Sequence, residues 1–170
     1  MGEPKAELIV AGRRLLDRAV TALRDGGCDP LIAVVRAGTT VSGVRAVVNF
    51  DPARGMRSSL ALAVEAADLA RADALAVLLV DVPGVGPEAV RAAIDAWRPG
   101  RIAVATYQGR RGHPTVMAPQ LWRTALEWAG PDEGARTLLG QRPDLVDEID
   151  VAGDPTDLDT PEDIRRWVQP

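Results

Sequence analysis

Short apolar runs alternate along the whole chain with longer segments of helical periodicity. The apolar runs, which are typical of buried strands, lie at residues 31–36, 44–49, 74–80, 102–107 and 145–151. Helices are indicated at residues 15–23, 60–70, 89–97, 120–128 and 133–139, and from Pro161 onward. Because strands that alternate with helices are the signature of a layered α/β fold, we expect three layers around a mainly parallel sheet, in one domain that spans residues 1–170.

Composition narrows the classes of function. Hydrophobic residues make up 46% of the 170 positions, which is enough for a sizeable core. The net charge is −4 and the basic residues are scattered along the chain, so a nucleic-acid partner is not expected. The longest apolar stretch, residues 75–80, is far too short to cross a bilayer, and no secretory signal opens the chain. We therefore expect a cytoplasmic protein with no membrane partner. The chain has a single cysteine, Cys28, so an internal disulfide is excluded. Because it also has a single histidine, a zinc site and a Cys–His nucleophile are excluded by the number of such residues.

The first five residues, Met1-Gly2-Glu3-Pro4-Lys5, read as the second half of a phosphate-binding loop. Successive backbone amides around Gly2 and the ammonium group of Lys5 suit phosphate oxygens, which need many donors at close range. Lys5 is therefore a candidate phosphate ligand. The alternative is an ordinary surface lysine near a frayed terminus.

A second candidate segment runs from Asn49 to Leu60 and contains Gly55-Met56-Arg57-Ser58-Ser59. A glycine at position 55 lets the backbone approach a flat nucleotide base. Ser58 and Ser59 stand where hydroxyl groups can cap the following helix and also point into a nucleotide site. The alternative is a loop and helix cap that bind no ligand.

Asp81 ends the most apolar run of the chain. Ligands of open parallel sheets bind at the carboxyl edge of the strands, so a carboxylate that emerges there can hold a magnesium ion that bridges nucleotide phosphates. Pro83 cannot continue the strand and frees the carboxylate. The alternative is an aspartate that only forms a turn before proline.

Two more carboxylates lie near the C-terminus, in the segment from Asp154 to Ile164. Side chains alternate along an extended segment, so Asp157 and Asp159 point the same way and could approach one metal, and Asp159 is the preferred second magnesium ligand. Thr160 and Pro161 read as the N-cap and first position of a helix, and Asp163 as a capping or dipole residue.

Two polar segments lie between these sites, at residues 107–114 and 130–136. The first is read as a basic loop that carries His113, the only histidine, beside Arg110 and Arg111, which suits a phosphorylated ligand. Arg136 ends the second segment. The alternative is that the lone histidine is structural or simply exposed.

Together these segments resemble the MobA-like NTP transferases, most closely the molybdenum-cofactor cytidylyltransferases. Met1–Lys5 is similar to the end of the family's loop, Arg-Met-Gly-x-x-Lys, and residues 154–164 to its Asp-Ile-Asp-Thr-Pro-Glu-Asp-Leu signature. The resemblance implies the Rossmann-like topology of nucleotide-diphospho-sugar transferases. It also implies a role for each matching residue: Lys5 and Asp81 in catalysis, Gly2, Lys5, Gly55, Met56, Ser58 and Ser59 in nucleotide binding, Asp81 and Asp159 as Mg²⁺ ligands, and Arg111, His113 and Arg136 in acceptor binding.

The implied reaction is attack by the terminal phosphate of molybdopterin on the α-phosphorus of an NTP, preferably CTP, with release of pyrophosphate. The implied partners are the NTP, a phosphorylated pterin and a molybdoenzyme that receives the product. Three alternatives remain open: guanylyl transfer to molybdopterin or to a phospholactate-like acceptor, a non-catalytic accessory protein that binds the cofactor, and a nucleotide-binding domain without transfer.

The resemblance departs from the family pattern at the start of the chain. The family has a central strand and the first half of the Gly-rich loop ahead of the position of Met1. A parallel sheet without its central strand leaves two rows of backbone groups unpaired, so we expect such a chain to be unstable or to aggregate. We interpret Met1 as the internal methionine of the motif, and N-terminal sequencing of a folded, active native protein would test this interpretation.

Overall fold

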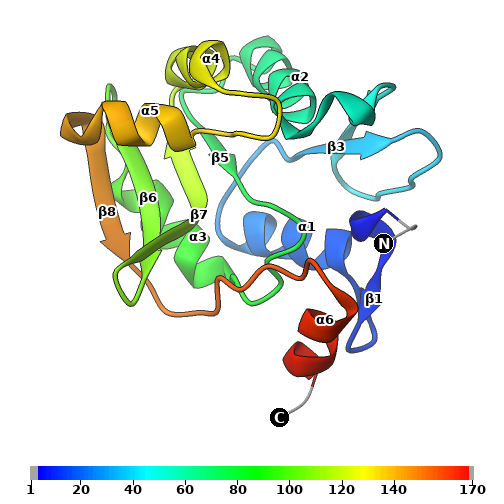
Figure 1. Cartoon of the computed structure of the whole chain (residues 1–170). Coiled ribbons are helices and arrows are strands. Elements are labelled where there is room, and N and C mark those ends of the chain that lie inside the picture. Colours follow the sequence, from blue (N-terminus) through cyan, green and yellow to red (C-terminus); the bar gives the residue numbers. More distant parts are fainter. Residues whose placement is uncertain (1–3, 169–170) are drawn as a thin grey trace.

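The computed structural model describes residues 4–168, in which helices and strands alternate along most of the chain (Figure 1). The α-helices are α1 (Leu15–Asp25), α2 (Met56–Leu69), α3 (Pro87–Ala96), α4 (Pro119–Trp128), α5 (Arg136–Gln141) and α6 (Pro161–Val168). The strands are β1 (Ile9–Val10), β2 (Arg13–Arg14), β3 (Ile32–Arg36), β4 (Arg45–Asn49), β5 (Leu75–Val77), β6 (Ile102–Tyr107), β7 (Arg110–Met117) and β8 (Val146–Asp150). Short 3-10 helices lie at Lys5–Glu7, Pro52–Arg54 and Pro143–Leu145.

The strands of the central region form two separate sheets. β3 and β4 pair in parallel, and β5, β7, β6 and β8 form a second sheet in that order. β6 and β8 are parallel, whereas β7 runs antiparallel to both of its neighbours. A small hairpin of β1 and β2 lies near the N-terminus. The expected α/β fold is therefore confirmed; of the mainly parallel pairing that was expected, the described strands show parallel pairs at β3–β4 and β6–β8.

Helices cover both faces of the strands, with α2, α4 and α5 on one side and α1 and α3 on the other (Figure 1). Successive side chains of β6 point to opposite faces of the sheet and contribute to the hydrophobic core on each face. Ile102 and Val104 pack in a cluster with side chains of α2, α4 and α5, whereas Ala103 packs with Ala93 of α3. Trp122 of α4 is fully buried and its indole Nε1 donates to the carbonyl oxygen of Leu75, 2.9 Å away, which ties α4 to β5.

Strand β7 was not predicted, because its first half reads as a basic loop. The backbone of β7 pairs with β5 on one edge and with β6 on the other, and this pairing outweighs the low strand propensity of its arginine, glycine and proline residues. β5 is also shorter than the predicted strand at 74–80. Its pairing with β7 spans Leu75–Val77, and residues 78–80 belong to no described strand.

The ends of two helices illustrate what local sequence can specify. Thr160 caps α6 as predicted: its Oγ1 accepts from the backbone N–H of Asp163 at 3.2 Å, and the Asp163 carboxylate accepts from the backbone N–H of Thr160 at 2.8 Å. α5 was expected from residue 133 but begins at Arg136. Glu133 instead closes a turn, since its Oε2 accepts from the backbone N–H of Gly130 at 3.0 Å.

Asp147 on β8 anchors the far edge of the sheet, where its carboxylate accepts hydrogen bonds from Arg101 and Arg98. The Arg101 guanidinium is the main cause that lowers the pKa of Asp147 from 3.8 to about 2. Because the folded pKa is depressed, the stabilisation is present above the unfolded pKa and is lost as pH falls through about 2. We expect Asp147→Asn to lower the melting temperature by a few degrees at neutral pH, and the difference from wild type to vanish near pH 2 in thermal unfolding curves. A difference that stays constant with pH would contradict this prediction.

Within residues 4–168, the structure contains no helix that is both long and apolar enough to cross a membrane.

Candidate functional site

Lys5, Asp81 and Asp159 meet at one point although they are far apart in the sequence. Lys5 begins the 3-10 helix at Lys5–Glu7, Asp81 follows β5, and Asp159 precedes α6. The Nζ of Lys5 donates to Oδ2 of Asp81 at 2.9 Å and to Oδ1 of Asp159. One ammonium group therefore lies between two carboxylates.

The segment before α6 is fixed by its backbone and by one apolar side chain. The N–H of Leu158 donates to the carbonyl oxygen of Asp81 at 2.8 Å, and the Leu158 side chain is fully buried with Val10 and Leu15. Because side chains alternate along an extended segment, burial of Leu158 leaves Asp157 and Asp159 exposed on either side of it. Of these two, Asp159 reaches Lys5.

The electrostatics of this cluster fit a divalent cation. Oδ1 of Asp81 is buried and has no hydrogen-bond partner among the described residues, which is costly for a carboxylate oxygen. Burial alone would lower the pKa of Lys5, but hydrogen bonds to Asp159 and Asp81 raise it on balance. Carboxylate oxygens are the ligands that Mg²⁺ and other hard cations prefer. The free oxygen of Asp81 and the two-carboxylate donor set therefore suit a metal in place of the ammonium group.

The backbone at Gly55 is in close contact with the loop at residues 130–136. It lies at φ +84°, and a Cβ there would stand 2.5 Å from the Asp132 carboxylate and 2.6 Å from the carbonyl oxygen of Pro131. The backbone N–H of Arg57 donates to the same Pro131 carbonyl at 3.0 Å. Only glycine fits this position without strain. The segment expected to bind nucleotide and part of the segment expected to bind the acceptor are thus in direct contact.

Asn49 at the end of β4 organises the two serines of α2. Its side chain is buried, and its Nδ2 donates to Oγ of Ser58 at 2.9 Å and to Oγ of Ser59 at 3.0 Å. The hydroxyl of Ser58 donates in turn to the carbonyl oxygen of Gly55 at 2.8 Å. No side chain caps the start of α2, so the helix cap expected from these serines is not formed. The proton of the Ser59 hydroxyl has no acceptor among the described residues. Asn49 was not among the predicted site residues, although its place in the motif was visible.

His113 lies in strand β7 and not in the expected polar loop. Its ring is partly buried, and Nδ1 lies 3.2 Å from the carbonyl oxygen of Val77 on β5. Burial lowers the pKa of His113, outweighing both this hydrogen bond and the attraction of Asp81. His113 is therefore a partly buried, neutral imidazole at pH 7 that lies near Asp81.

Arg111 and Arg136 do not join His113. Arg111 is exposed on β7, and its Nε donates to the Glu148 carboxylate of β8 at 2.7 Å. Arg136 begins α5, beside the turn that Glu133 closes. No hydrogen bond or ion pair among residues 4–168 links these arginines, or Gly55, Met56, Ser58 and Ser59, to the cluster of Lys5, Asp81 and Asp159. Gly2 lies outside the described residues.

The burial of His113 predicts a pH dependence of stability. Because burial holds its pKa below the ordinary 6.5, the unfolded chain binds a proton near pH 6 that the folded chain does not, so stability falls as pH drops below about 6.5. We expect the wild-type melting temperature to fall between about pH 7 and pH 5, and His113→Asn to show a shallower fall. Since His113 is the only histidine, no other imidazole contributes. Parallel curves for the two proteins would contradict the prediction.

Comparisons with known proteins relate this geometry to a family. The model of the MobA-like NTP transferase domain matches residues 1–146, which include Lys5, Gly55 and Asp81. A nicotine blue oxidoreductase from Paenarthrobacter nicotinovorans is 37% identical over 181 residues, covering 97% of this chain and 88% of that protein. A probable molybdenum cofactor guanylyltransferase from Opitutus terrae is 38% identical over 92 residues, covering 50% of this chain and 43% of that protein.

A solved structure supports the same relation over nearly the whole length. Rv0371c from Mycobacterium tuberculosis, in complex with manganese, superimposes with a TM-score of 0.78 at 28% identity, covering 98% of this chain and 92% of that chain. The family match spans most of the sequence and includes two of the three residues that meet at the carboxylate cluster. The chain belongs to the MobA-like NTP transferase family and is a nucleotidyltransferase.

Proposed function

We propose that this chain transfers cytidine monophosphate from CTP to the terminal phosphate of molybdopterin and releases pyrophosphate. The observation that carries the proposal is the meeting of Lys5 with Asp81 and Asp159 at the ends of three separate segments. Two carboxylates that can hold a cation, with an ammonium group beside them, suit the charge of a triphosphate. NTP use is the property that the family shares, whereas CTP and molybdopterin are the proposed specifics.

The reaction needs no protein nucleophile. An oxygen of the acceptor phosphate forms a bond to the α-phosphorus of CTP, the bond from that phosphorus to the bridging oxygen breaks, and pyrophosphate leaves with the electron pair. Lys5 donates to phosphate oxygens, and Asp81 and Asp159 would hold Mg²⁺. When bound, Mg²⁺ supplies positive charge that offsets the charge of the phosphates. The chain contributes positioning and charge neutralisation.

The nucleotide would lie against the start of α2. Gly55 allows a close approach of the backbone, and Asn49 holds Ser59 so that its hydroxyl proton is available for a ligand. The partly buried His113 would shape the site beside Asp81 as a neutral group, while Arg111 and Arg136 would contact the acceptor only after leaving their present surroundings.

Two other functions have specific support. Guanylyl transfer is favoured by the relation to a probable molybdenum cofactor guanylyltransferase. A redox reaction is favoured by 37% identity with a nicotine blue oxidoreductase across 97% of this chain.

The described residues offer no group of three or more histidine, cysteine, aspartate or glutamate side chains arranged to hold a metal, so the two-carboxylate site would rely on nucleotide oxygens to complete the coordination of Mg²⁺.

The deciding experiment measures pyrophosphate release from CTP and from GTP with molybdopterin and Mg²⁺. This chain is compared with a version that carries the residues encoded immediately upstream of Met1. We expect turnover with CTP. Turnover with GTP alone would replace the proposal by guanylyl transfer.

A parallel assay follows the visible absorbance of nicotine blue in the presence of an added electron donor. Absorbance loss without any pyrophosphate release in either version would overturn the transfer proposal in favour of a redox function. Tight molybdopterin binding without either reaction would favour a non-catalytic accessory protein.

A further inference from the structure

The stretch of chain that follows β5 and the stretch that precedes α6 lie side by side. The N–H of Asp154 donates to the carbonyl oxygen of Gly84 at 3.2 Å, and these two residues form an antiparallel bridge. Further along, the N–H of Leu158 donates to the carbonyl oxygen of Asp81 at 2.8 Å. These two pairs of residues define a backbone contact between the stretches. One proposed metal ligand, Asp81, belongs to this contact, and the other, Asp159, follows it directly.

A glycine at position 84 makes the backbone contact possible. Gly84 does not lie in the left-handed region of φ, so its backbone conformation does not require glycine. A Cβ at this position, however, would stand 2.6 Å from the carbonyl oxygen of Asp154 and 2.7 Å from the Cβ of Asp154. Side-chain carbons do not come this close to other atoms, so a larger residue would push the two stretches apart. Asp159 would then move away from Asp81.

Tyr107, the last residue of β6, supports the stretch that precedes α6. Its side chain is 4% exposed, and its hydroxyl donates to the carbonyl oxygen of His113 on β7 at 2.6 Å. A Cβ at Gly112 would stand 3.0 Å from Cε2 of the ring, and a Cβ at Gly153 would stand 3.2 Å from Cε1 and 3.0 Å from the carbonyl oxygen of Gly84. Glycine backbone therefore approaches the ring on both of its edges. The backbone contact rests on a rigid strand, which is what a precise site needs.

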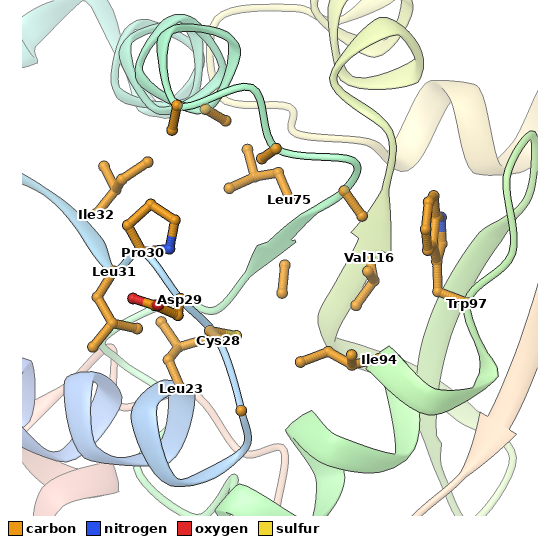
Figure 2. Close-up of a pocket in the computed structure, with 16 residues that line it drawn as sticks. Leu23, Cys28, Asp29, Pro30, Leu31, Ile32, Leu75, Ile94, Trp97 and Val116 are labelled. Carbon is orange, nitrogen blue, oxygen red and sulfur yellow. The ribbon is translucent and has the colours of Figure 1, made fainter.

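The apolar cavity of the molecule has no part in this support. Its volume is about 180 Å³ and it lies at the start of β5, where Leu75 forms part of its wall (Figure 2). Its described lining contains no residue of the candidate site and none of residues 81–84 and 151–159. Among the contacts of the described residues, the separation of Asp81 and Asp159 therefore depends on the backbone contact and on Lys5.

We propose that Gly84 is a positioning residue of the candidate metal site, because the backbone contact that it permits sets the separation of Asp81 and Asp159. A single Mg²⁺ must meet both carboxylates at about 2.1 Å, so a displacement of about 1 Å would take one of them out of reach. The inference rests on the proposed transfer reaction, in which these carboxylates hold the cation. Gly84 has no side chain to bind a ligand, and it acts through Asp159.

The first measurement reads the contact between Lys5 and Asp159. Lys5 is the only lysine, so a ¹³C label at the lysine Cε gives a single NMR signal. Asp159→Asn supplies the reference position of this signal when the ion pair is lost. At a constant pH of 7, we expect Gly84→Ala to move the signal most of the way from its wild-type position to that reference.

The second measurement is the affinity for Mn²⁺ alone, followed by electron paramagnetic resonance without nucleotide or acceptor. Gly84→Ala should weaken Mn²⁺ binding about tenfold, which is a usual cost of changing a group that orients a metal ligand. Neither measurement needs turnover.

Gly86→Ala is the matched control. A Cβ at Gly86 would meet only Oε2 of Glu88, which is the far end of a flexible side chain. Because Gly86 is the N-cap of α3, the substitution should lower the melting temperature by a few degrees. It should leave the Lys5 signal and the affinity for Mn²⁺ unchanged.

A second pair of variants tests the same contact if Gly84→Ala does not fold. Leu158→Val shortens a fully buried side chain at the other end of the backbone contact. Leu138→Val shortens an equally buried side chain in a cluster that contains none of the site residues. The two variants should lose similar stability. Only Leu158→Val should move the Lys5 signal toward the reference position and weaken Mn²⁺ binding.

Three results would overturn the proposal. The first is an unmoved Lys5 signal in both Gly84→Ala and Leu158→Val, because Asp159 would then keep its position without the contact. The second is a moved signal with unchanged affinity for Mn²⁺, because the separation would then not matter to the cation. The third is an equal change in each variant and its control, which would leave Gly84 with a structural role alone.

Failure of the proposed reaction gives a different result. If the wild type released no pyrophosphate from CTP or GTP, the transfer reaction would be removed. The expected changes in the Lys5 signal and in Mn²⁺ affinity would still support the positioning role of Gly84.

Discussion

Asp81→Asn is expected to lower the rate of pyrophosphate release by about 10³-fold. The Asp81 carboxylate has one oxygen on Lys5 and one buried oxygen without a described partner, and it is the less exposed of the two proposed metal ligands. An amide keeps the shape of the side chain but removes the charge that would hold a cation against the phosphates. The measurement is the turnover rate at saturating CTP and Mg²⁺, in the form of the chain that turns over.

A folding defect could imitate this loss, so stability is measured on the same samples. Because the substitution removes a buried charge that is only half satisfied, the melting temperature of Asp81→Asn should not fall by more than about 4 °C. Asp157→Asn is the matched control, since this exposed carboxylate lies two residues from Asp159 and does not contact Lys5 in the structure. Equal losses in the two variants would remove Asp81 from the mechanism.

Most of the fold could be predicted where local patterns and tertiary packing agree. β6 spans residues 102–107, the predicted run, because every one of its side chains is buried and the run is apolar. α6 begins at Pro161 because Thr160 and Asp163 form a capping box that depends only on neighbours in the sequence. In both elements the secondary structure that the local sequence favours is also the one that the surroundings in the fold require.

Prediction failed where a distant partner determines the element. Residues 110–114 contain two arginines, a glycine, a histidine and a proline, and they belong to a strand because β6 pairs with Arg110 and Arg111 while β5 and β6 both pair with residues 115–117. Burial of His113 follows from that pairing. β5 shows the opposite case, since an apolar run of seven residues is a strand over only the three that pair with β7.

The candidate site divides in the same way. Sequence motifs identify Lys5, Asp81 and Asp159 one at a time, but 76 positions separate Lys5 from Asp81 and 154 separate it from Asp159, so their meeting is a property of the fold. The sequence motif includes Asn49 but does not reveal its hydrogen bonds to Ser58 and Ser59, because each serine could have served as a helix cap. Predicted functional residues thus become a site only when the fold brings together the segments that carry them.

Lys5→Met should change metal binding and catalysis in opposite directions. Lys5 holds the two carboxylates that would bind the cation, so the metal and the ammonium group compete for the same oxygens while no nucleotide is bound. Without the ammonium charge, the affinity for Mn²⁺ in the absence of nucleotide should rise about tenfold, a modest gain because Lys5 and Asp159 are partly exposed to solvent. The rate of pyrophosphate release should fall about 10²-fold, because a donor to the phosphates is lost.

If the ammonium group and the metal compete in this way, Lys5 has a second role besides binding phosphate: it balances the charge of the two carboxylates while no nucleotide is bound. It is the only lysine among the 20 basic residues, and a flexible ammonium group can leave the carboxylates for the phosphates more easily than a guanidinium fork. Lys5→Arg should therefore keep the weak Mn²⁺ affinity of the wild type and recover little of the rate. Calorimetric titration with Mn²⁺ and the pyrophosphate assay separate the two tasks. If Lys5→Met weakened metal binding as well as catalysis, Lys5 would support the metal site instead of competing for it.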